Sequence, residues 1–245
     1  EGVTFHDGSP LAAADVKASF DKIVSPPEGV VSPRKSYFQM IKSIEAPDPS
    51  TVVFLLHYAS PSFLSMLAHP ANFVYAKKYL DQDPNYYKQK AMGTGPFKLK
   101  EYVHGSSIEL ARNPNYWKQG FPYMDGVKYF IIKDDGARAK SIRGDRTDVE
   151  FRGFNPTEVE ALQGQMGDKV VVTHPGQPAH WDICVNVDKK PFDDERVRKA
   201  LSLAIDRYDM AKTIGPLTGM DTVGGPQPPG SLGALTGEEL APLPG

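Results

Sequence analysis

Glycine and proline interrupt the apolar pattern of this chain so often that its helices and strands must be short. The 245 residues include 22 glycines and 22 prolines, whereas the two types together make up roughly 12% of an average protein. The longest apolar runs, such as Val52–Leu56 and Tyr129–Ile132, fall far below the ~20 residues of a membrane-spanning helix. Because 40% of the residues are still apolar, the sequence predicts a folded, loop-rich globular protein that does not span a membrane.

Charge and cysteine content exclude further classes of protein. The 28 Lys and Arg residues nearly balance the 30 Asp and Glu residues, which leaves a net charge of −2. Nucleic acid is therefore not an expected partner, since no positive field attracts its phosphates. Cys184 is the single cysteine, which excludes an internal disulfide and CxxC metal sites but leaves the redox compartment open.

Two stretches have the apolar spacing of an amphipathic helix. Apolar residues recur every three or four positions over Ala12–Val24 and again over Asp193–Tyr208. Pro26 and Pro27 end the first helix, and acidic residues open the second, where the helix dipole favours negative charge. Shorter helices are expected at Ser60–Ala68, Ala137–Arg143 and Pro156–Gln163.

Two β-hairpins are expected in the first half of the chain. Tyr37–Ala46 and Thr51–Tyr58 have strand character and flank a proline-containing turn at residues 47–50. Phe97–Tyr102 and Ser107–Arg112 form the second pair. Further strands are expected at Gly2–Gly8, Gly126–Lys133, Asp148–Phe151, Lys169–Thr173 and Trp181–Val187.

Both ends of the chain have features of an incomplete unit. The opening strand Gly2–Gly8 needs a partner, which earlier residues are expected to supply, and Gly215–Gly245 is rich in Gly and Pro with no apolar period. We therefore expect a middle section of a longer protein, with any export signal lying outside it.

Sequence motifs of the common catalytic and metal-binding classes are absent. Gly93-Thr94-Gly95 is followed by a proline and a strand pattern, so it lacks the helix N-terminus of a phosphate loop. No two of the six histidines fall at i, i+4, and HExxH does not occur. We expect no catalytic residue, no cofactor and no metal site.

A hydrolase is the alternative that the residues leave open. Its nucleophile set would be Cys184 with His180 or Asp182. His180 and Cys184 would lie roughly 13 Å apart along a strand, which is too far for proton transfer.

Three long segments carry motifs in a fixed order. They are VTFHDGSPLAAADVKASFDKI (Val3–Ile23), MGTGPFKL (Met92–Leu99) followed by IELARNPNYW (Ile108–Trp117), and PFDDERVRKALSLAIDR (Pro191–Arg207). They resemble the FHDG(S/T)P strand–turn–helix, the GTGPY/F hairpin with its RNPxYW segment, and the PFxDxRVRxALxxAIDR helix of ABC-importer solute-binding proteins, in the family that takes up peptides, nickel and related solutes. In that family the RNPxYW segment is structural. One departure is Ala12, which stands where relatives usually place Thr as the N-cap.

The resemblance implies a mixed α/β, periplasmic-binding-protein-like type II fold of two lobes, of which this chain holds a part. Residues 1–91 would form a subdomain that flanks lobe 1. Residues 92–182 would form the mixed-sheet domain of lobe 1, and residues 183–245 the hinge and the truncated start of lobe 2.

The resemblance also implies a function. The protein would be a non-catalytic receptor that closes around a small solute, an oligopeptide or dipeptide first of all, and delivers it to the permease subunits in the membrane. It would act as a monomer outside the cytoplasm, in the periplasm or as a cell-surface lipoprotein. A nickel or metal-chelate carrier, or a haem carrier of the same family, is the alternative.

On this basis one candidate ligand contact is the loop Phe151-Arg152-Gly153-Phe154, at the exit of an expected strand. It offers aromatic faces, a close backbone approach at the glycine, and an arginine that can pair with an anionic group. A solvated loop with a capping phenylalanine is the equal alternative.

The other candidate contacts lie at the crossover between lobes and near a helix end. Trp181, Asp182 and Cys184 belong to the expected hinge strand, so Asp182 and Cys184 share one face while Trp181 takes the other. His69, directly before Pro70, either reaches the ligand or caps the chain locally.

Overall fold

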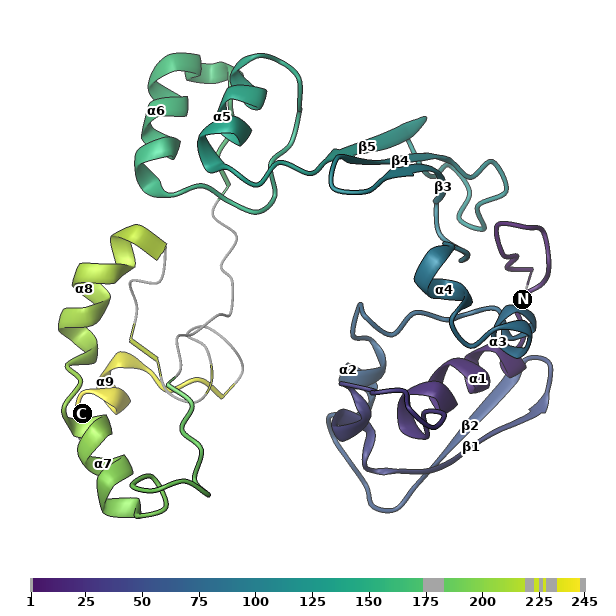
Figure 1. Ribbon diagram of the computed structural model, residues 1–245, viewed down its shortest axis with the longest axis horizontal. Helices are drawn as coiled ribbons and strands as arrows, with labels where there is room; N and C mark the ends of the chain where they lie inside the picture. Colours follow the sequence, from purple (N-terminus) through teal and green to yellow (C-terminus); the bar gives the residue numbers. More distant parts are fainter. Residues whose placement is uncertain (1, 174–182, 219–222, 225–226, 228–232, 243–245) are drawn as a thin grey trace. The chain divides into compact units, whose positions relative to one another are not determined.

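The computed structural model describes residues 2–173, 183–218, 223–224, 227 and 233–242 (Figure 1). Its contacts divide the chain into two compact units, Glu1–Ile131 and Ile132–Gly245, and each unit is described by itself. The expected boundaries at 1–91, 92–182 and 183–245 refer to the lobes of a whole two-lobed protein and stay predictions.

The core of the first unit lies between a helix and a hairpin. Helix α1 (Ala13–Val24) packs on the antiparallel strands β1 (Ile41–Asp48) and β2 (Thr51–Leu56) (Figure 1). Phe20 of α1 meets the ring edges of Phe38 and Phe54, with centroids 5.6 and 5.4 Å apart. Burial of such rings is a large apolar contribution to stability. The buried cluster consists of Phe20, Ile23, Phe38, Met40, Ile41 and Ile44.

The expected first helix and first hairpin are confirmed, with changes at their edges. The hairpin's first strand starts at Ile41, because Lys35–Phe38 form a 3₁₀ helix, η1, in place of the start of the expected strand. Helix α2 (Phe63–Leu67) lies inside the expected range. Helices α3 (Lys77–Gln82) and α4 (Tyr86–Gln89) were not expected from the sequence.

Two side chains of α1 and one of α4 accept hydrogen bonds from the backbone of residues 75–77. The N–H groups of residues 75, 76 and 77 donate in order to Ser19 Oγ (2.8 Å), Tyr87 Oη (2.8 Å) and Asp15 Oδ1 (2.7 Å). The buried Asp15 carboxylate also accepts the N–H of Ala12 at 2.9 Å. Asp15 therefore provides the N-terminal capping of α1 that the Ala12 side chain cannot provide.

The opening segment finds its partner within its own motif. Thr4 pairs with Pro10, and the N–H of Leu11 donates to the Val3 carbonyl at 2.9 Å. The chain turns back because Asp7 Oδ1 accepts both the N–H and the hydroxyl of Ser9, at 2.9 and 2.7 Å. The expected strand Gly2–Gly8 is therefore reduced to a single bridge that closes a turn, and pairing with earlier residues stays a prediction.

A three-stranded antiparallel sheet completes the first unit. Strands β3 (Phe97–Val103), β4 (Ser107–Arg112) and β5 (Gly126–Phe130) pair in chain order, which confirms the second hairpin and its neighbour. The register gathers most of the apolar residues on one face, which Arg112 also shares, whereas the charged Lys98, Glu101, Glu109 and Lys128 lie on the other. The apolar face carries Leu99, Tyr102, Ile108, Leu110, Val127 and Tyr129.

The sequence motifs of the first unit meet at one backbone carbonyl. Gly95 O lies 3.1 Å from His6 Nε2 and accepts Asn113 Nδ2 at 3.1 Å. Around it, the N–H of His6 donates to Gly93 O at 2.9 Å, and the N–H of Asn113 donates to Pro96 O at 2.8 Å. Asn113 is buried. The FHDG, GTGPF and RNP residues therefore form a structural junction, as expected for the RNPxYW segment.

The junction changes the titration of His6. Desolvation lowers the pKa of His6 below its ordinary 6.5, with the positive charge of Lys98 acting in the same direction. The hydrogen bond to Gly95 O and the charge of Asp7 oppose this change. The folded junction therefore favours the neutral imidazole.

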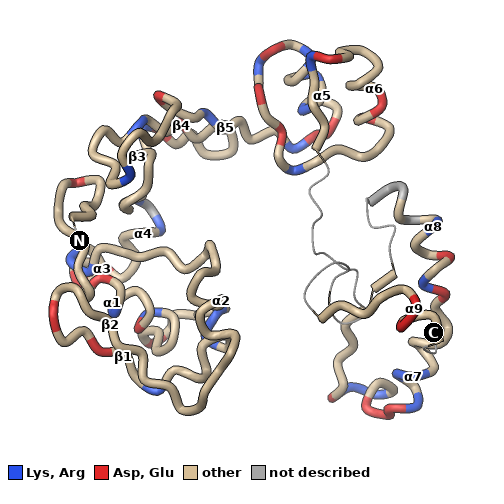
Figure 2. The backbone as a smooth tube through the Cα atoms, turned by 180° about the vertical axis from the view of Figure 1, so that it is seen from behind, with Lys and Arg blue, Asp and Glu red and all other residues tan. Residues whose placement is uncertain are grey.

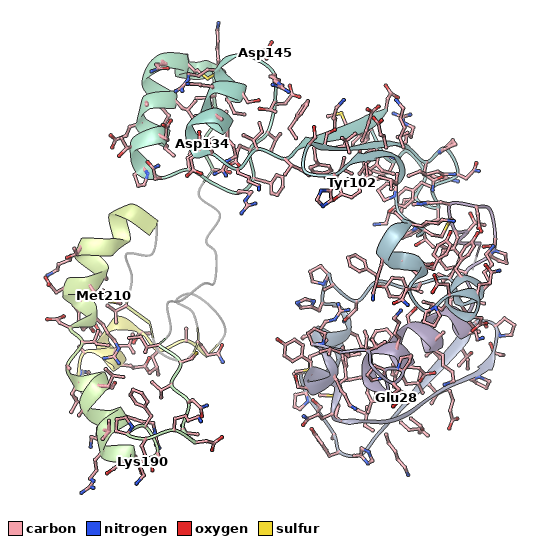
Figure 3. The ribbon with its side chains drawn as sticks, in the orientation of Figure 1. Glu28, Tyr102, Asp134, Asp145, Lys190 and Met210 are labelled. Carbon is pink, nitrogen blue, oxygen red and sulfur yellow. The ribbon has the colours of Figure 1, made fainter. Side chains whose placement is uncertain are left out.

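The second unit is helical in the residues described. Helix α5 (Asp135–Arg143) packs on α6 (Pro156–Met166), which runs into the 3₁₀ helix η2 (Gly167–Lys169). The remaining helices are α7 (Glu195–Leu203), α8 (Arg207–Thr218) and α9 (Gly237–Leu240). Asp134, labelled in Figure 3, starts α5 by accepting the N–H of Ala137 at 2.7 Å.

The described residues of the second unit do not form the three strands that we expected there. Asp148–Phe151 runs into a side-chain-closed turn, and Lys169–Thr173 begins with the last residue of η2. For Trp181–Val187, residues 183–187 are irregular, while residues 181 and 182 lie outside the described part. An apolar segment becomes a strand only beside a hydrogen-bonding partner strand, and the described residues offer none there.

The expected helix Asp193–Tyr208 is two helices. Asp194 accepts the N–H of Arg196 at 2.8 Å and starts α7, which ends at Leu203. Asp206 then accepts the N–H of Asp209 at 2.9 Å, which is the N-cap geometry of a new helix. The helical periodicity continues across the break because α8 follows directly, and α8 extends past Gly215 into the expected loop.

Candidate functional site

The eight candidate ligand contacts fall in different parts of the chain. Phe151–Phe154 joins α5 to α6 in the second unit, whereas His69 belongs to the first unit. Cys184 is exposed in an irregular segment. Trp181 and Asp182 lie outside the described residues. Phe151, Arg152, Gly153 and Phe154 lie together on one loop of the second unit, and they are called the 151–154 loop below.

The backbone of the 151–154 loop is closed by one carboxylate. Glu150 Oε1 accepts the N–H of Arg152 at 3.1 Å, and Oε2 accepts the N–H of Gly153 at 2.7 Å. Gly153 has φ = +87°, a left-handed conformation that is strained for residues with a Cβ. The loop then enters α6 at Asn155, whose side chain accepts the N–H of Glu158 at 3.0 Å.

An arginine from α5 holds the same loop from the other side. Arg138 Nη2 donates to the Gly153 carbonyl at 3.1 Å and pairs with Asp135 Oδ1 at 3.0 Å. Its Nε lies 3.4 Å from Glu150 Oε1, and its guanidinium carbon lies 5.5 Å from the centre of the Phe154 ring. Figure 2 shows both signs of charge on α5 and the chain that follows it.

Burial separates the holding side chains from the presented ones. The Arg138 and Glu150 side chains are only 13% and 12% exposed, whereas Phe151 is 73% exposed. Arg152 is exposed and Phe154 is half-buried. A fixed backbone therefore presents an aromatic ring and a guanidinium to solvent, a combination suited to a solute with an apolar part and an anionic group.

The candidates outside the loop have local surroundings. His69 Nδ1 accepts the N–H of Ala71 at 3.1 Å, which is the local capping alternative; a role in ligand contact stays a prediction. Cys184 lies in residues 183–186, which are not a strand. Its expected shared face with Asp182 involves a residue outside the described part.

Three further features of the described residues bear on the chemistry of the site. They contain no group of three or more His, Cys, Asp or Glu side chains placed to hold a metal ion. Within the same residues, no helix has the length and apolar character to cross a bilayer. A surface hollow of about 390 Å³ lies beside α5 and does not include the 151–154 loop; it is lined by Ile132, Ala137, Lys140, Ser141, Gly144 and Arg146.

Sequence reasoning missed the two residues that shape the loop. Glu150 could have been found from the sequence, because a carboxylate can accept the N–H groups of the residues two and three positions after it in a turn. Arg138 was not detectable, because its contacts with Gly153 and Phe154 span 15 or more positions and follow no periodic pattern.

Comparison with known proteins identifies the family. The family model described as "Bacterial extracellular solute-binding proteins, family 5 Middle" matches residues 1–241. The chain belongs to this family. The resemblance in the motifs is thereby confirmed. Among family 5 relatives, the glutathione-binding protein GsiB of Salmonella typhi is 30% identical over 212 residues, which cover 86% of this chain and 40% of GsiB.

Solved structures confirm the mixed α/β, periplasmic-binding-protein fold. The binding protein DppA from Helicobacter pylori, in complex with the peptide STSA, matches with a TM-score of 0.74 and 26% identity, over 93% of this chain and 48% of DppA. The binding protein AgaA from A.tumefacien R10, in complex with agropinic acid, gives a TM-score of 0.74 at 23% identity, over 97% of this chain and 47% of AgaA. The chain thus spans less than half the length of these family 5 relatives.

Proposed function

We propose that the protein containing this chain is the solute receptor of an ABC importer and that its solute is a small peptide. The observation that carries this proposal is the family match over residues 1–241. Two relatives support the solute class, since GsiB is named for glutathione, a tripeptide, and DppA is solved with the peptide STSA. The receptor needs no catalytic group or cofactor, because it releases its solute unchanged.

The proposed mechanism is a shift between open and closed states of two lobes. A solute that contacts both lobes favours the closed state, and only the difference between its affinities for the two states drives closure. The closed receptor then passes the solute to the permease subunits in the membrane. We place the receptor outside the cytoplasm, in the periplasm or as a surface lipoprotein, and as a monomer.

We propose the 151–154 loop as part of the wall that contacts the solute. Phe151 offers an exposed ring for an apolar side chain of the peptide. Arg152 offers a guanidinium for the peptide's C-terminal carboxylate. Removal of these groups is therefore expected to weaken peptide binding without unfolding the helices on either side.

Isothermal titration calorimetry of the protein as its host produces it tests the proposal. The panel contains glutathione, STSA and synthetic di- to pentapeptides, with agropinic acid and nickel–histidine as non-peptide arms. We expect at least one peptide to bind in the micromolar range or tighter and to be recovered chemically intact. Binding of only a non-peptide arm contradicts the peptide assignment, and hydrolysis of a bound peptide contradicts the receptor assignment.

Variants of the same protein test the wall. Phe151→Ala and Arg152→Ala are each expected to weaken the peptide found in the panel by about tenfold, since one good contact is worth ~1–2 kcal/mol. Val171→Ala is the matched control, because Val171 is an 83% exposed apolar residue of the same unit outside the loop. Equal affinities for all three variants and the parent exclude the loop from the site.

A further inference from the structure

We propose that Arg138 and Glu150 are positioning residues that hold the 151–154 loop in its binding shape before the solute arrives. Neither side chain needs to touch the solute. The inference rests on the proposed function, because it gives the preformed loop a purpose in solute binding, but the shape itself is testable without any ligand.

The first argument comes from the number of loop backbone groups that side chains engage. Both N–H groups at Arg152 and Gly153 donate to Glu150, and the Gly153 carbonyl accepts from Arg138. Each of these groups is normally bonded to water in an exposed loop. Here three backbone groups, on three successive peptide units, are instead bonded to two side chains.

The second argument comes from the cost of burying these charges. A buried ion pair gives little net stability, because desolvation offsets the attraction, and its better-attested role is to specify one geometry. The Arg138–Glu150 pair, with side chains 13% and 12% exposed, comes close to this description. Within the described residues, Arg138 Nε has no hydrogen-bond partner and lies 3.4 Å from Glu150 Oε1. The pair is therefore better suited to fixing the loop than to stabilising the helices.

The third argument comes from what the fixed loop presents. Phe151 is 73% exposed while its neighbour Phe154 packs under the Arg138 guanidinium. Phe154 anchors the end of the loop and leaves the Phe151 and Arg152 side chains at its tip. Preorganisation of this kind raises affinity because the solute does not have to order the loop.

Hydrogen exchange tests the shape without a ligand. In the protein as its host produces it, we expect the amides of Arg152 and Gly153 to exchange at least tenfold faster in Glu150→Gln and in Arg138→Met than in the parent. The amide of the buried Leu162 in α6 serves as the internal control and should not change. Unchanged exchange at Arg152 and Gly153 in both variants overturns the proposal.

A double-mutant cycle tests the purpose. With glutathione and STSA as probes, Arg138→Met is expected to weaken binding by about tenfold in the parent, from the ordering that the solute must then supply. In the Phe151→Ala/Arg152→Ala background the same change should have little further effect, because the groups that the loop positions are gone. A merely structural role predicts equal losses in both backgrounds, and this result would overturn the positioning role.

Arg138→Lys separates charge from geometry and covers the case in which Arg138→Met does not fold. Lysine keeps the charge but cannot reach Gly153, Asp135 and Glu150 with one planar group. The Arg152 and Gly153 amides of Arg138→Lys should therefore exchange faster than those of the parent, as in Arg138→Met. If the Arg152 and Gly153 amides of Arg138→Lys exchange as slowly as those of the parent, the proposed geometry is contradicted. If no peptide of the calorimetry panel binds the parent protein, the peptide assignment under the proposed function fails, and the exchange rates alone decide whether Arg138 and Glu150 fix the loop.

Discussion

Replacing Asp15 is the sharpest test of how the first unit is held together. Its carboxylate accepts the N–H of Ala12 at 2.9 Å and the N–H of Lys77 at 2.7 Å, and the residue is only 8% exposed. Hydrogen bonds to a charged group contribute roughly 1.5–3 kcal/mol each. Water partly replaces the bond to the half-buried Ala12, so Asp15→Ala should lower the free energy of unfolding by about 2–4 kcal/mol.

Asp15→Asn should cost about half as much as Asp15→Ala. The amide oxygen of asparagine can accept one of the two N–H groups, whereas its NH₂ group faces the other donor. Equilibrium urea unfolding measures both variants, provided that their m-values agree with that of the parent.

Asp21→Ala is the matched control on the same helix. Asp21 is a half-exposed residue that pairs with Lys17 at 2.6 Å, and such exposed i, i+4 pairs contribute only about 0.3–0.5 kcal/mol. If Asp15→Ala costs no more than this control, the capping and tethering role assigned to Asp15 is refuted.

Three further changes have a clear sign. Gly126→Ala should destabilise the sheet and lower the melting temperature, because the new Cβ would lie 2.6 Å from the Leu110 carbonyl oxygen. Gly164→Ala should raise stability by about 0.5–1 kcal/mol in urea unfolding, since the position is inside α6 with nothing within 4 Å of the new Cβ. The pKa of His6 is lowered in the folded protein. The contribution of neutral His6 to the free energy of unfolding is therefore complete above pH 6.5 and declines as the pH falls below 6.5. His6→Gln should therefore flatten the pH dependence of stability between pH 7.5 and 5.

Local sequence signals predicted the parts of the fold that local chemistry determines. The α1 periodicity and the proline turn between β1 and β2 involve neighbours in the chain, so the pattern of one segment is sufficient. The prediction for the opening Gly2–Gly8 segment was less accurate, because a strand pattern does not reveal that the Asp7 side chain accepts two hydrogen bonds from Ser9 and closes a turn.

In the second unit, the secondary structure depends on tertiary contacts that the sequence pattern does not show. Apolar alternation at Asp148–Phe151 and Lys169–Thr173 suggested strands, but an extended segment depends on a partner that the segment itself does not encode. The helix break before Arg207 was missed for a related reason, since the stripe of apolar residues continues across it while Asp206 caps a new helix.

The shape of the candidate loop was predicted in outline only, and its contact with a solute stays a prediction. The composition of Phe151–Phe154 marked a loop with aromatic and cationic groups, and the structure places these residues on one turn. The side chains that shape the turn come from Glu150 and from α5, and the contact of Arg138 with Gly153 joins residues 15 positions apart. Such a contact leaves no trace in the spacing of either segment.

The junction at the Gly95 carbonyl gives the residues of the family motifs a role in assembling the first unit. His6 and Asn113 converge on that oxygen from two distant motifs, so their task is to join the turn at residues 4–10 to the β3–β4 hairpin. A chain that keeps this junction can alter the loops elsewhere and still assemble the same framework. Under the proposed function, a search for a new solute preference should therefore leave these motifs intact and vary the residues of the 151–154 loop, which take no part in this junction.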